Sequence, residues 1–165
     1  MKRKLTTHWI ATTAVLAAVY YALTVVFAPI SYGPVQFRVS EIMNLLAFYN
    51  PAFAPGIVLG VFLSNISSPL GLYDLFFGTF HTAISLYFMC KLHKKWVASL
   101  MPALFSWIIG FELVLAFGGG LVGFLTMSLS VAASEVIICT LISLPVYEAL
   151  DRNAAFRSIV SKNPQ

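Results

Sequence analysis

Long apolar runs dominate the sequence. The first continues for about 20 residues, from His8 to Ala28, and a helix of that length crosses the roughly 30 Å hydrocarbon core of a bilayer. Of the 165 residues, 59% are hydrophobic and 10% are charged, whereas charged residues form about a quarter of a soluble domain. These properties predict an integral membrane protein. The first run lacks the short core and the cleavage site of a signal peptide, so we expect it to be a retained span.

Proline, glycine and clustered charges divide the apolar sequence into helix-sized segments. Their length argues against a β-barrel, whose strands have about 10 residues of alternating pattern. We therefore predict a single all-α domain over residues 1–165, folded as a bundle of six transmembrane helices. The second helix is short and is expected to be a partial span that leads through Pro51 into the third. The six expected helices cover about residues 8–28, 40–50, 52–67, 71–90, 97–117 and 121–149.

The basic residues set the expected orientation. With the N-terminus in the cytoplasm, nine of the ten Lys and Arg residues fall on the cytoplasmic side, as the positive-inside rule requires. Both termini are then cytoplasmic, and the net charge of +4 reflects cytoplasmic loops rather than nucleic-acid binding. Arg38 is the exception. The nine residues are Lys2, Arg3, Lys4, Lys91, Lys94, Lys95, Arg152, Arg157 and Lys162.

Several polar side chains interrupt the apolar helices. Ionisable groups inside a bilayer are unfavourable by several kcal/mol unless they are paired or wetted, so each is a candidate for function. With the orientation above, these residues all occupy the outer half of the bundle, where Arg38 offers the single positive charge. They predict an outward-opening substrate-binding pocket that is rich in hydrogen-bond acceptors. Besides Arg38, the predicted pocket residues are Glu41, Asn65, Asp74, His81, Glu112 and Glu135.

Structural roles are the alternative for these residues. Glu41, paired with Arg38, and Asp74 could each be an acid that stabilises a helix start. His81 lies two turns after Asp74 on the same face, and it could be a core histidine bonded to a carbonyl or hydroxyl group. Glu135 lies far from either helix end and is the hardest to explain structurally. The loop SYGPVQFRVSE (residues 31–41) is expected to close over the outer mouth as a lid, with the Arg38–Glu41 bond holding it.

Contacts between helices are suggested by small residues. Ala14, Ala18 and Ala22 recur with Ala11 at small-xxx-small spacing on one face of the first helix, which permits close helix contact. This face could meet another subunit or pack inside the same chain. Glu112, flanked by apolar residues, could likewise pair with a partner subunit. Both cysteines fall within apolar runs and are expected to pack there without forming a disulfide.

A family resemblance is carried by residues 35–79, VQFRVSEIMNLLAFYNPAFAPGIVLGVFLSNISSPLGLYDLFFGT. This segment resembles the QueT family, the queuosine-precursor substrate-binding (S) components of energy-coupling-factor (ECF) transporters. The specific points are the FRVSE element, the Pro-Gly of the third helix, the Asn near its end and the later Asp-x-x-x-Gly. Chain length, six spans and the alanine stripe extend the resemblance over about residues 8–150. The sequence departs from the pattern at His81, where a small apolar residue is expected.

The resemblance implies an S-component-like fold and a transport function. It implies a subunit in a prokaryotic plasma membrane that captures a 7-deazaguanine base outside and delivers it inward. A scaffold membrane subunit, contacted by Ala14, Ala18 and Ala22, and two cytoplasmic ATPases would supply the energy. Carboxylates suit the donor edge of a guanine-like base and the ammonium of an aminomethyl group. No cofactor or metal is expected, and the chain has no phosphate-binding Gly-Lys-Ser/Thr loop, so we expect a transporter subunit without an ATPase site.

Other functions remain as alternatives. Within the same class, the ligand could be another vitamin or nucleobase. A membrane-embedded enzyme could use the Asp, Glu and His side chains as metal ligands or as acid and base, but the sequence has no His-Glu-x-x-His or Gly-x-Ser-x-Gly motif. A purely structural subunit would bind no small molecule.

Overall fold

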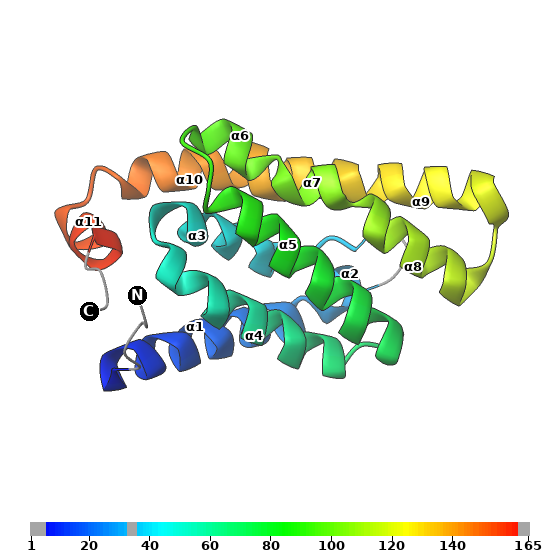
Figure 1. The fold of residues 1–165 in the computed structure, drawn as a ribbon, viewed down its shortest axis with the longest axis horizontal. Helices are drawn as coiled ribbons and strands as arrows, with labels where there is room; N and C mark the ends of the chain where they lie inside the picture. Colours follow the sequence, from blue (N-terminus) through cyan, green and yellow to red (C-terminus); the bar gives the residue numbers. More distant parts are fainter. Residues whose placement is uncertain (1–5, 33–35, 162–165) are drawn as a thin grey trace.

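Helices make up the fold. The structure is a computed structural model that describes residues 6–32 and 36–161, and this part of the chain contains helices, turns and bends but no strand. Most helices run along the long axis of the molecule, with α1 on one side and the α9–α10 rod on the other (Figure 1). The predicted all-α class is confirmed for the described residues.

The helices are longer runs broken by short irregular turns. η1 and η2 are 3-10 helices, and η3 and η4 are π-helical turns within longer helices. Along the chain the elements are α1 (Thr7–Val26), α2 (Ala28–Ser31), η1 (Val39–Leu45), α3 (Leu46–Tyr49), η2 (Pro51–Phe53), α4 (Ala54–Ile66), η3 (Asp74–Gly78), α5 (Thr79–Met89), α6 (Lys95–Ser99), α7 (Met101–Phe105), α8 (Trp107–Phe117), α9 (Gly120–Glu135), η4 (Val136–Ile142), α10 (Ser143–Leu150) and α11 (Ala154–Ser161).

Among the residues that the structure describes, three helices are long and apolar enough to cross a membrane. They are Thr7–Val26, Lys95–Phe117 and Gly120–Leu150, with 20, 23 and 31 residues. Two shorter apolar helices cover Val39–Tyr49 and Pro51–Ile66. The chain is therefore a multi-pass membrane protein, whereas the count of six spans stays a prediction.

Close packing of α1 against α4 forms one wall of the core. A Cβ atom added to Gly60 would lie 2.6 Å from the Cβ of Tyr20, and one added to Gly56 would lie 3.0 Å from the Cβ of Leu16. The two glycines therefore let the helix backbones approach, as small residues do between membrane helices. Tyr20 is fully buried in the main apolar core, together with Ile57 and other side chains.

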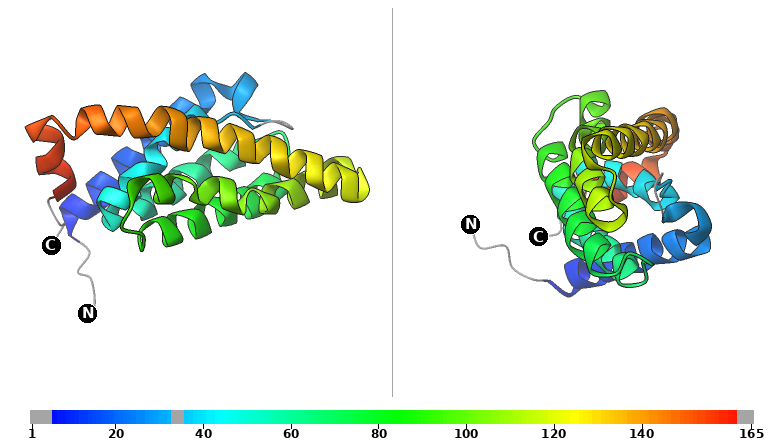
Figure 2. Two further views of the ribbon diagram at one scale, coloured as in Figure 1. Left: turned by 90° about the horizontal axis from the view of Figure 1, so that it is seen from above. Right: turned by 90° about the vertical axis from the view of Figure 1, so that its right-hand side faces the viewer.

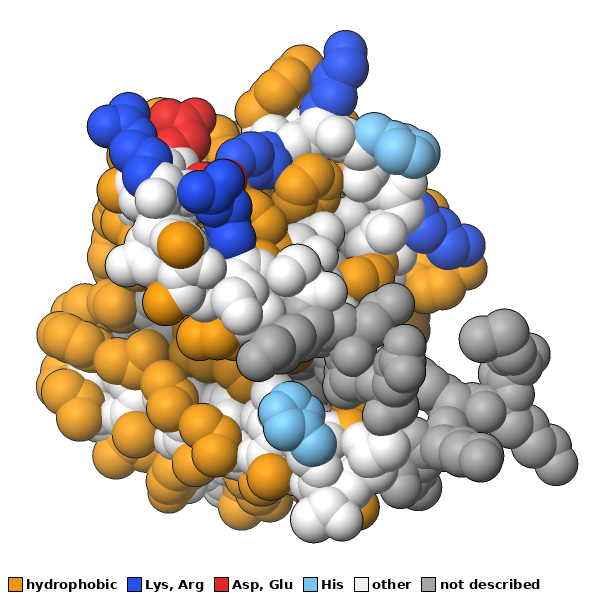
Figure 3. Space-filling model, turned by 90° about the vertical axis from the view of Figure 1, so that its left-hand side faces the viewer, with side chains coloured by type: hydrophobic (Ala, Val, Ile, Leu, Met, Phe, Trp, Pro, Cys, Tyr) orange, Lys and Arg blue, Asp and Glu red, His pale blue; other side chains and the backbone are white. Residues whose placement is uncertain are grey.

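Basic residues gather at one end of the molecule. Both ends of the described chain and the α5–α6 connection lie toward the left of Figure 1, and Figure 3 shows Lys and Arg side chains on that end. We call this the basic end; its exposed residues are Lys91, Lys94, Arg152 and Arg157. Lys2, Arg3, Lys4 and Lys162, which were assigned to the same side, lie outside the described residues. That this end faces the cytoplasm stays a prediction.

Helix α11 was not predicted. It turns away from α10 and lies across the basic end (Figure 2), where its Phe156 ring contacts the ring of Tyr49 at a centroid distance of 5.6 Å. Beside this contact Asp151 accepts hydrogen bonds from Lys95 Nζ at 2.5 Å and from Tyr49 Oη at 2.6 Å. Burial raises the pKa of Asp151, but the two hydrogen bonds outweigh it and hold that pKa below its usual value.

Candidate ligand-binding site

Polar side chains are concentrated in the interior of the bundle. Each of the seven predicted pocket residues is buried, and none is more than 5% exposed. Burying ionisable groups is unfavourable by several kcal/mol per ion unless partners compensate, so each contact matters. They form two centres, one around Glu41 and one around Asp74. The seven residues are Arg38, Glu41, Asn65, Asp74, His81, Glu112 and Glu135.

The first centre contains two carboxylates and a thiol. Glu41 comes from η1, Glu135 ends α9 and Cys139 follows one turn later in η4. One ligand atom from each lies within 4.8 Å of the others. The Cys139 thiol donates to Glu135 Oε2 at 3.3 Å, and Asn44 Nδ2 donates to Glu41 Oε2 at 3.3 Å. The expectation that Cys139 packs among apolar groups is therefore wrong. By their spacing, the three side chains could also hold a metal ion.

The second centre surrounds Asp74, the first residue of η3. Arg38 Nη2 forms an ion pair with Asp74 Oδ1 at 3.4 Å, and Gln36 Nε2 donates to the same oxygen at 3.3 Å. The Ser68 hydroxyl donates to Asp74 Oδ2. Asp74 thus has donors on both oxygens, and its carboxylate is the better satisfied of the buried acids.

Arg38 does not bind Glu41 as expected. Besides Asp74, its Nε donates to the Ser31 carbonyl oxygen at 3.3 Å, so the guanidinium is directed back toward α2 and across to η3. The backbone of Arg38 is extended, which lets its side chain diverge from that of Glu41 in the following 3-10 helix. Glu41 interacts with Arg38 only through the longer-range electrostatic field. Gly33 and Pro34 of the expected lid lie outside the described residues.

Two of the predicted pocket residues brace the helices. Asn65 Nδ2 donates to the Asp74 carbonyl oxygen at 2.8 Å and to Thr79 Oγ1 at 3.3 Å, which ties the end of α4 to η3 and α5. His81 Nε2 bonds the Pro102 carbonyl oxygen at 2.9 Å and so links α5 to α7. His81 therefore adopts the structural role considered from the sequence. It also lies within electrostatic range of Glu41.

Glu112 is the least satisfied of the buried acids. Its side chain is fully buried on α8, and neither carboxylate oxygen accepts a hydrogen bond from a donor among the described residues. It interacts with Asp74 and, more weakly, with Arg38. Because Asp74 is also an acid, the two carboxyl groups can bond directly only by sharing a proton. Since Glu112 is buried, the alternative that it pairs with a partner subunit at the surface is wrong.

Besides Cys139, three residues of these centres were missed in the sequence. Asn44 lies three residues after Glu41, at helical spacing, and this spacing could have suggested it. Gln36 has a φ of 47°, an uncommon value for a residue other than glycine, but sequence gives no sign of it. Ser68 reaches Asp74 from the α4–η3 connection, and a Ser-Ser-Pro sequence alone indicates only a turn.

The alanine stripe points away from both centres. Ala14, Ala18 and Ala22 are exposed, whereas Tyr20 and Thr24 form the buried face of the same helix. Thr24 Oγ1 lies 2.7 Å from the hydroxyl of Ser40, next to Glu41. The alternative that the stripe packs inside the chain is therefore wrong, and α1 presents different faces to the site and to the surroundings.

The spans and the buried polar centres together define a class of protein, a helical multi-pass membrane protein with polar and ionisable side chains in its interior. The sequence model of the QueT transporter family matches residues 10–152, and the chain belongs to that family. Over 68 residues the chain is 43% identical to the protein named Queuosine precursor transporter QueT from Lactococcus lactis subsp. cremoris (strain MG1363). The match covers 40% of this chain and 40% of that relative. No solved structure matches the chain.

Proposed function

We propose that this chain is the substrate-binding membrane subunit of an ECF-type importer, and that it captures a 7-deazaguanine precursor of queuosine. Membership of the QueT transporter family supports transport, and the printed name of the Lactococcus lactis relative supports the ligand. The observation that carries the proposal is the buried pair Glu41 and Glu135, whose ligand atoms lie within 4.8 Å of each other. The alternative is an S component for another vitamin or nucleobase.

The carboxylate pair suits a ligand rich in donors. Two buried acids at this separation repel each other when both are charged, and a positive or hydrogen-donating ligand between them relieves the repulsion. A guanine-like edge offers ring and amino N–H groups to one carboxylate, and an aminomethyl substituent offers an ammonium to another. Asn44 Oδ1, buried beside Glu41 without a hydrogen-bond donor among the described residues, adds an acceptor. Asp74 is already paired with Arg38, so in the proposal it does not bind the ligand but holds η3 in position beside the site.

Transport would require partners. In the proposal the basic end faces the cytoplasm with both termini, so that the ligand is captured from outside and released inward. The exposed Ala14, Ala18 and Ala22 face would contact a scaffold membrane subunit, since small residues let membrane helices approach closely. Two cytoplasmic ATPases would then supply the energy, because the chain has no phosphate-binding Gly-Lys-Ser/Thr loop of its own.

Ligand binding is tested directly with purified full-length protein in detergent. Isothermal titration calorimetry and thermal unfolding are measured with 7-aminomethyl-7-deazaguanine, 7-cyano-7-deazaguanine, guanine, riboflavin and folate. We expect heat of binding and a raised unfolding temperature with a deazaguanine, since a ligand that binds the folded state stabilises it. Saturable binding of a vitamin instead would replace the proposed ligand. If no compound gives heat of binding or raises the unfolding temperature, the chain is not a binding subunit for any of these five compounds.

Substituting the acid pair tests the site. Glu41→Gln and Glu135→Gln keep the side-chain shape but turn an acceptor oxygen into a donor, a buried mismatch of roughly 1–3 kcal/mol. Each variant should bind the deazaguanine at least about tenfold more weakly by calorimetry. Glu148→Gln, an exposed acid on α10, is the matched control and should bind like the wild type. Wild-type affinity in both buried variants would show that the ligand lies elsewhere.

A further inference from the structure

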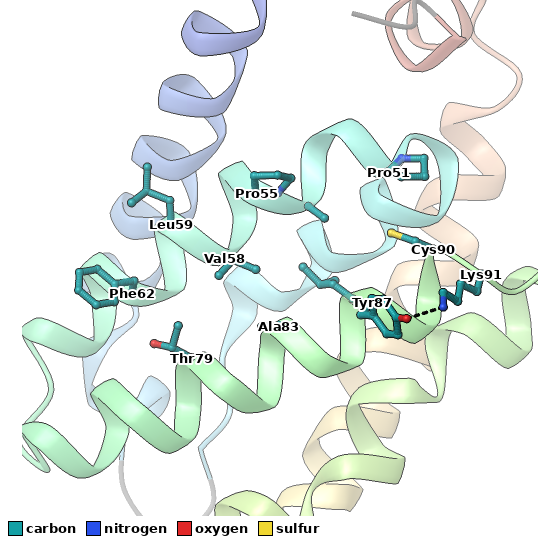
Figure 4. A pocket seen from close by; sticks show the side chains of 12 residues that line it. Pro51, Pro55, Val58, Leu59, Phe62, Thr79, Ala83, Tyr87, Cys90 and Lys91 are labelled. Carbon is teal, nitrogen blue, oxygen red and sulfur yellow. Dashed lines mark hydrogen bonds between the residues drawn. The ribbon is translucent and has the colours of Figure 1, made fainter. Parts of the chain in front are cut away.

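An apolar groove runs along the outside of the bundle between α4 and α5. Its volume is about 690 Å³, within the roughly 300–1,000 Å³ range of small-molecule sites. Pro55, Val58 and Phe62 line it from α4, and Ala83 and Tyr87 line it from α5 (Figure 4). None of these residues belongs to the two buried polar centres. In a multi-pass membrane protein, such an outward-facing apolar surface meets the acyl chains of the bilayer.

One end of the groove is cationic. Lys91 closes the lining at the basic end, where its Nζ donates to the Tyr87 hydroxyl at 2.5 Å and lies 4.0 Å from the centroid of that ring (Figure 4). Among the described residues the two ion pairs are Arg38–Asp74 and Lys95–Asp151, so no carboxylate neutralises Lys91. The exposed Lys94 adds a second cation nearby in sequence. The groove is thus lined mainly by apolar side chains along its length and is positively charged at its mouth.

The groove is as long as one leaflet is thick. Its lining extends from Pro51 of η2 to Phe62 of α4. Three residue steps at a rise of about 2.0 Å in the 3-10 helix and eight at about 1.5 Å in the α-helix together span about 18 Å. Half of the roughly 30 Å hydrocarbon core is about 15 Å. A smaller hollow of about 360 Å³ shares Phe62, Thr79 and Ala83 with the groove. The end away from Lys91 is therefore open to longer chains.

We propose that this groove binds one anionic phospholipid from the leaflet at the basic end. An acyl chain lies between α4 and α5, and the phosphate contacts Lys91. The Tyr87 hydroxyl and ring hold the ammonium at the level where the headgroups begin. An anionic lipid is favoured over a zwitterionic one because the mouth carries cations without a compensating acid, and each such cation attracts anionic lipid at the membrane surface.

Native mass spectrometry of the full-length protein tests this site. The protein is incubated in detergent with an equimolar mixture of phosphatidylglycerol and phosphatidylcholine that have the same acyl chains. We expect the wild type to retain phosphatidylglycerol preferentially, and Lys91→Gln to lower that preference about fivefold, the effect of one cation near the surface. Ala83→Trp, which fills the groove, should reduce retention of both lipids.

Matched controls separate the groove from general charge and size effects. Arg152→Gln removes another exposed cation at the basic end, and Leu129→Trp enlarges an exposed residue of α9; both should retain lipid like the wild type. Unchanged retention in Lys91→Gln and Ala83→Trp overturns the site. Equal binding of the two lipids overturns the headgroup assignment. Lipid retention that survives Ala83→Trp while a partner protein is lost would make the groove a protein interface instead.

Discussion

Replacing Ala18 by Trp is expected to abolish co-purification with a scaffold subunit and to abolish uptake of the deazaguanine in cells. Ala18 lies on the exposed face of α1, so an indole there would hold a partner helix away, whereas close helix contact requires small residues. The buried face of α1, with Tyr20 and Thr24, is unchanged. Ligand affinity of the isolated chain, measured by calorimetry, should therefore stay within a few-fold of the wild type.

Leu129→Trp on α9 is the control for this prediction, because it places the same indole at an exposed position on another helix. Complex assembly is followed by pull-down and uptake with labelled ligand. If Ala18→Trp assembles and transports normally, the alanine stripe meets lipid rather than a partner. If the variant loses ligand affinity together with assembly, α1 transmits the change to the site through its buried face.

Replacing Arg38 by Leu should destabilise the folded protein by about 3–5 kcal/mol, the usual effect of removing one partner from a buried ion pair. The Arg38 and Asp74 side chains are 4% and 0% exposed, so the loss leaves a buried carboxylate without its cation. The double variant Arg38→Leu/Asp74→Leu should recover much of that free energy. Equilibrium unfolding, monitored by circular dichroism in mixed micelles, measures both.

The surface pair Lys95–Asp151 provides a comparison within the same chain. Its side chains are 34% and 29% exposed, and exposed pairs contribute about 0–1 kcal/mol. Lys95→Gln should therefore change the free energy of unfolding far less than Arg38→Leu does. Equal effects of the two substitutions would mean that water reaches Asp74, and the buried centre described above would then be open in solution.

The helical class and the burial of the acids followed directly from the sequence. Apolar runs of membrane-spanning length specify helices, because backbone polar groups in a bilayer must bond within the segment. Acids inside such runs have no polar surface nearby, so Glu112 and Glu135 were expected to be buried together with other polar groups. The spacing of the alanines could not predict that their stripe is exposed, since a helix face has the same periodicity whether it points into the bundle or out of it.

Partner choice could not be read from sequence. Arg38 and Asp74 are 36 positions apart, and the nearer Glu41 gave the simpler pairing. Cys139 was treated as apolar because its neighbours in sequence are apolar, but the carboxylate of Glu135, one turn earlier, faces it. His81 lies at the right spacing to share a face with Asp74, yet its bond to the Pro102 carbonyl depends on how α5 meets α7. These choices depend on contacts between distant segments.

Both polar centres adjoin a π-helical turn, since Asp74 begins η3 and η4 follows directly after Glu135. A π turn holds one residue more than the α turn it replaces, and such turns recur at functional sites. Each residue of an α-helix advances the side-chain direction by about 100°, the result of 3.6 residues per turn. If η4 reverted to α-helix, α9 with Glu135 would turn by about 100° relative to α10, whose Tyr147 packs in the main core. A one-residue change of register, without any broken span, would thus separate the two carboxylates that the ligand is proposed to bridge.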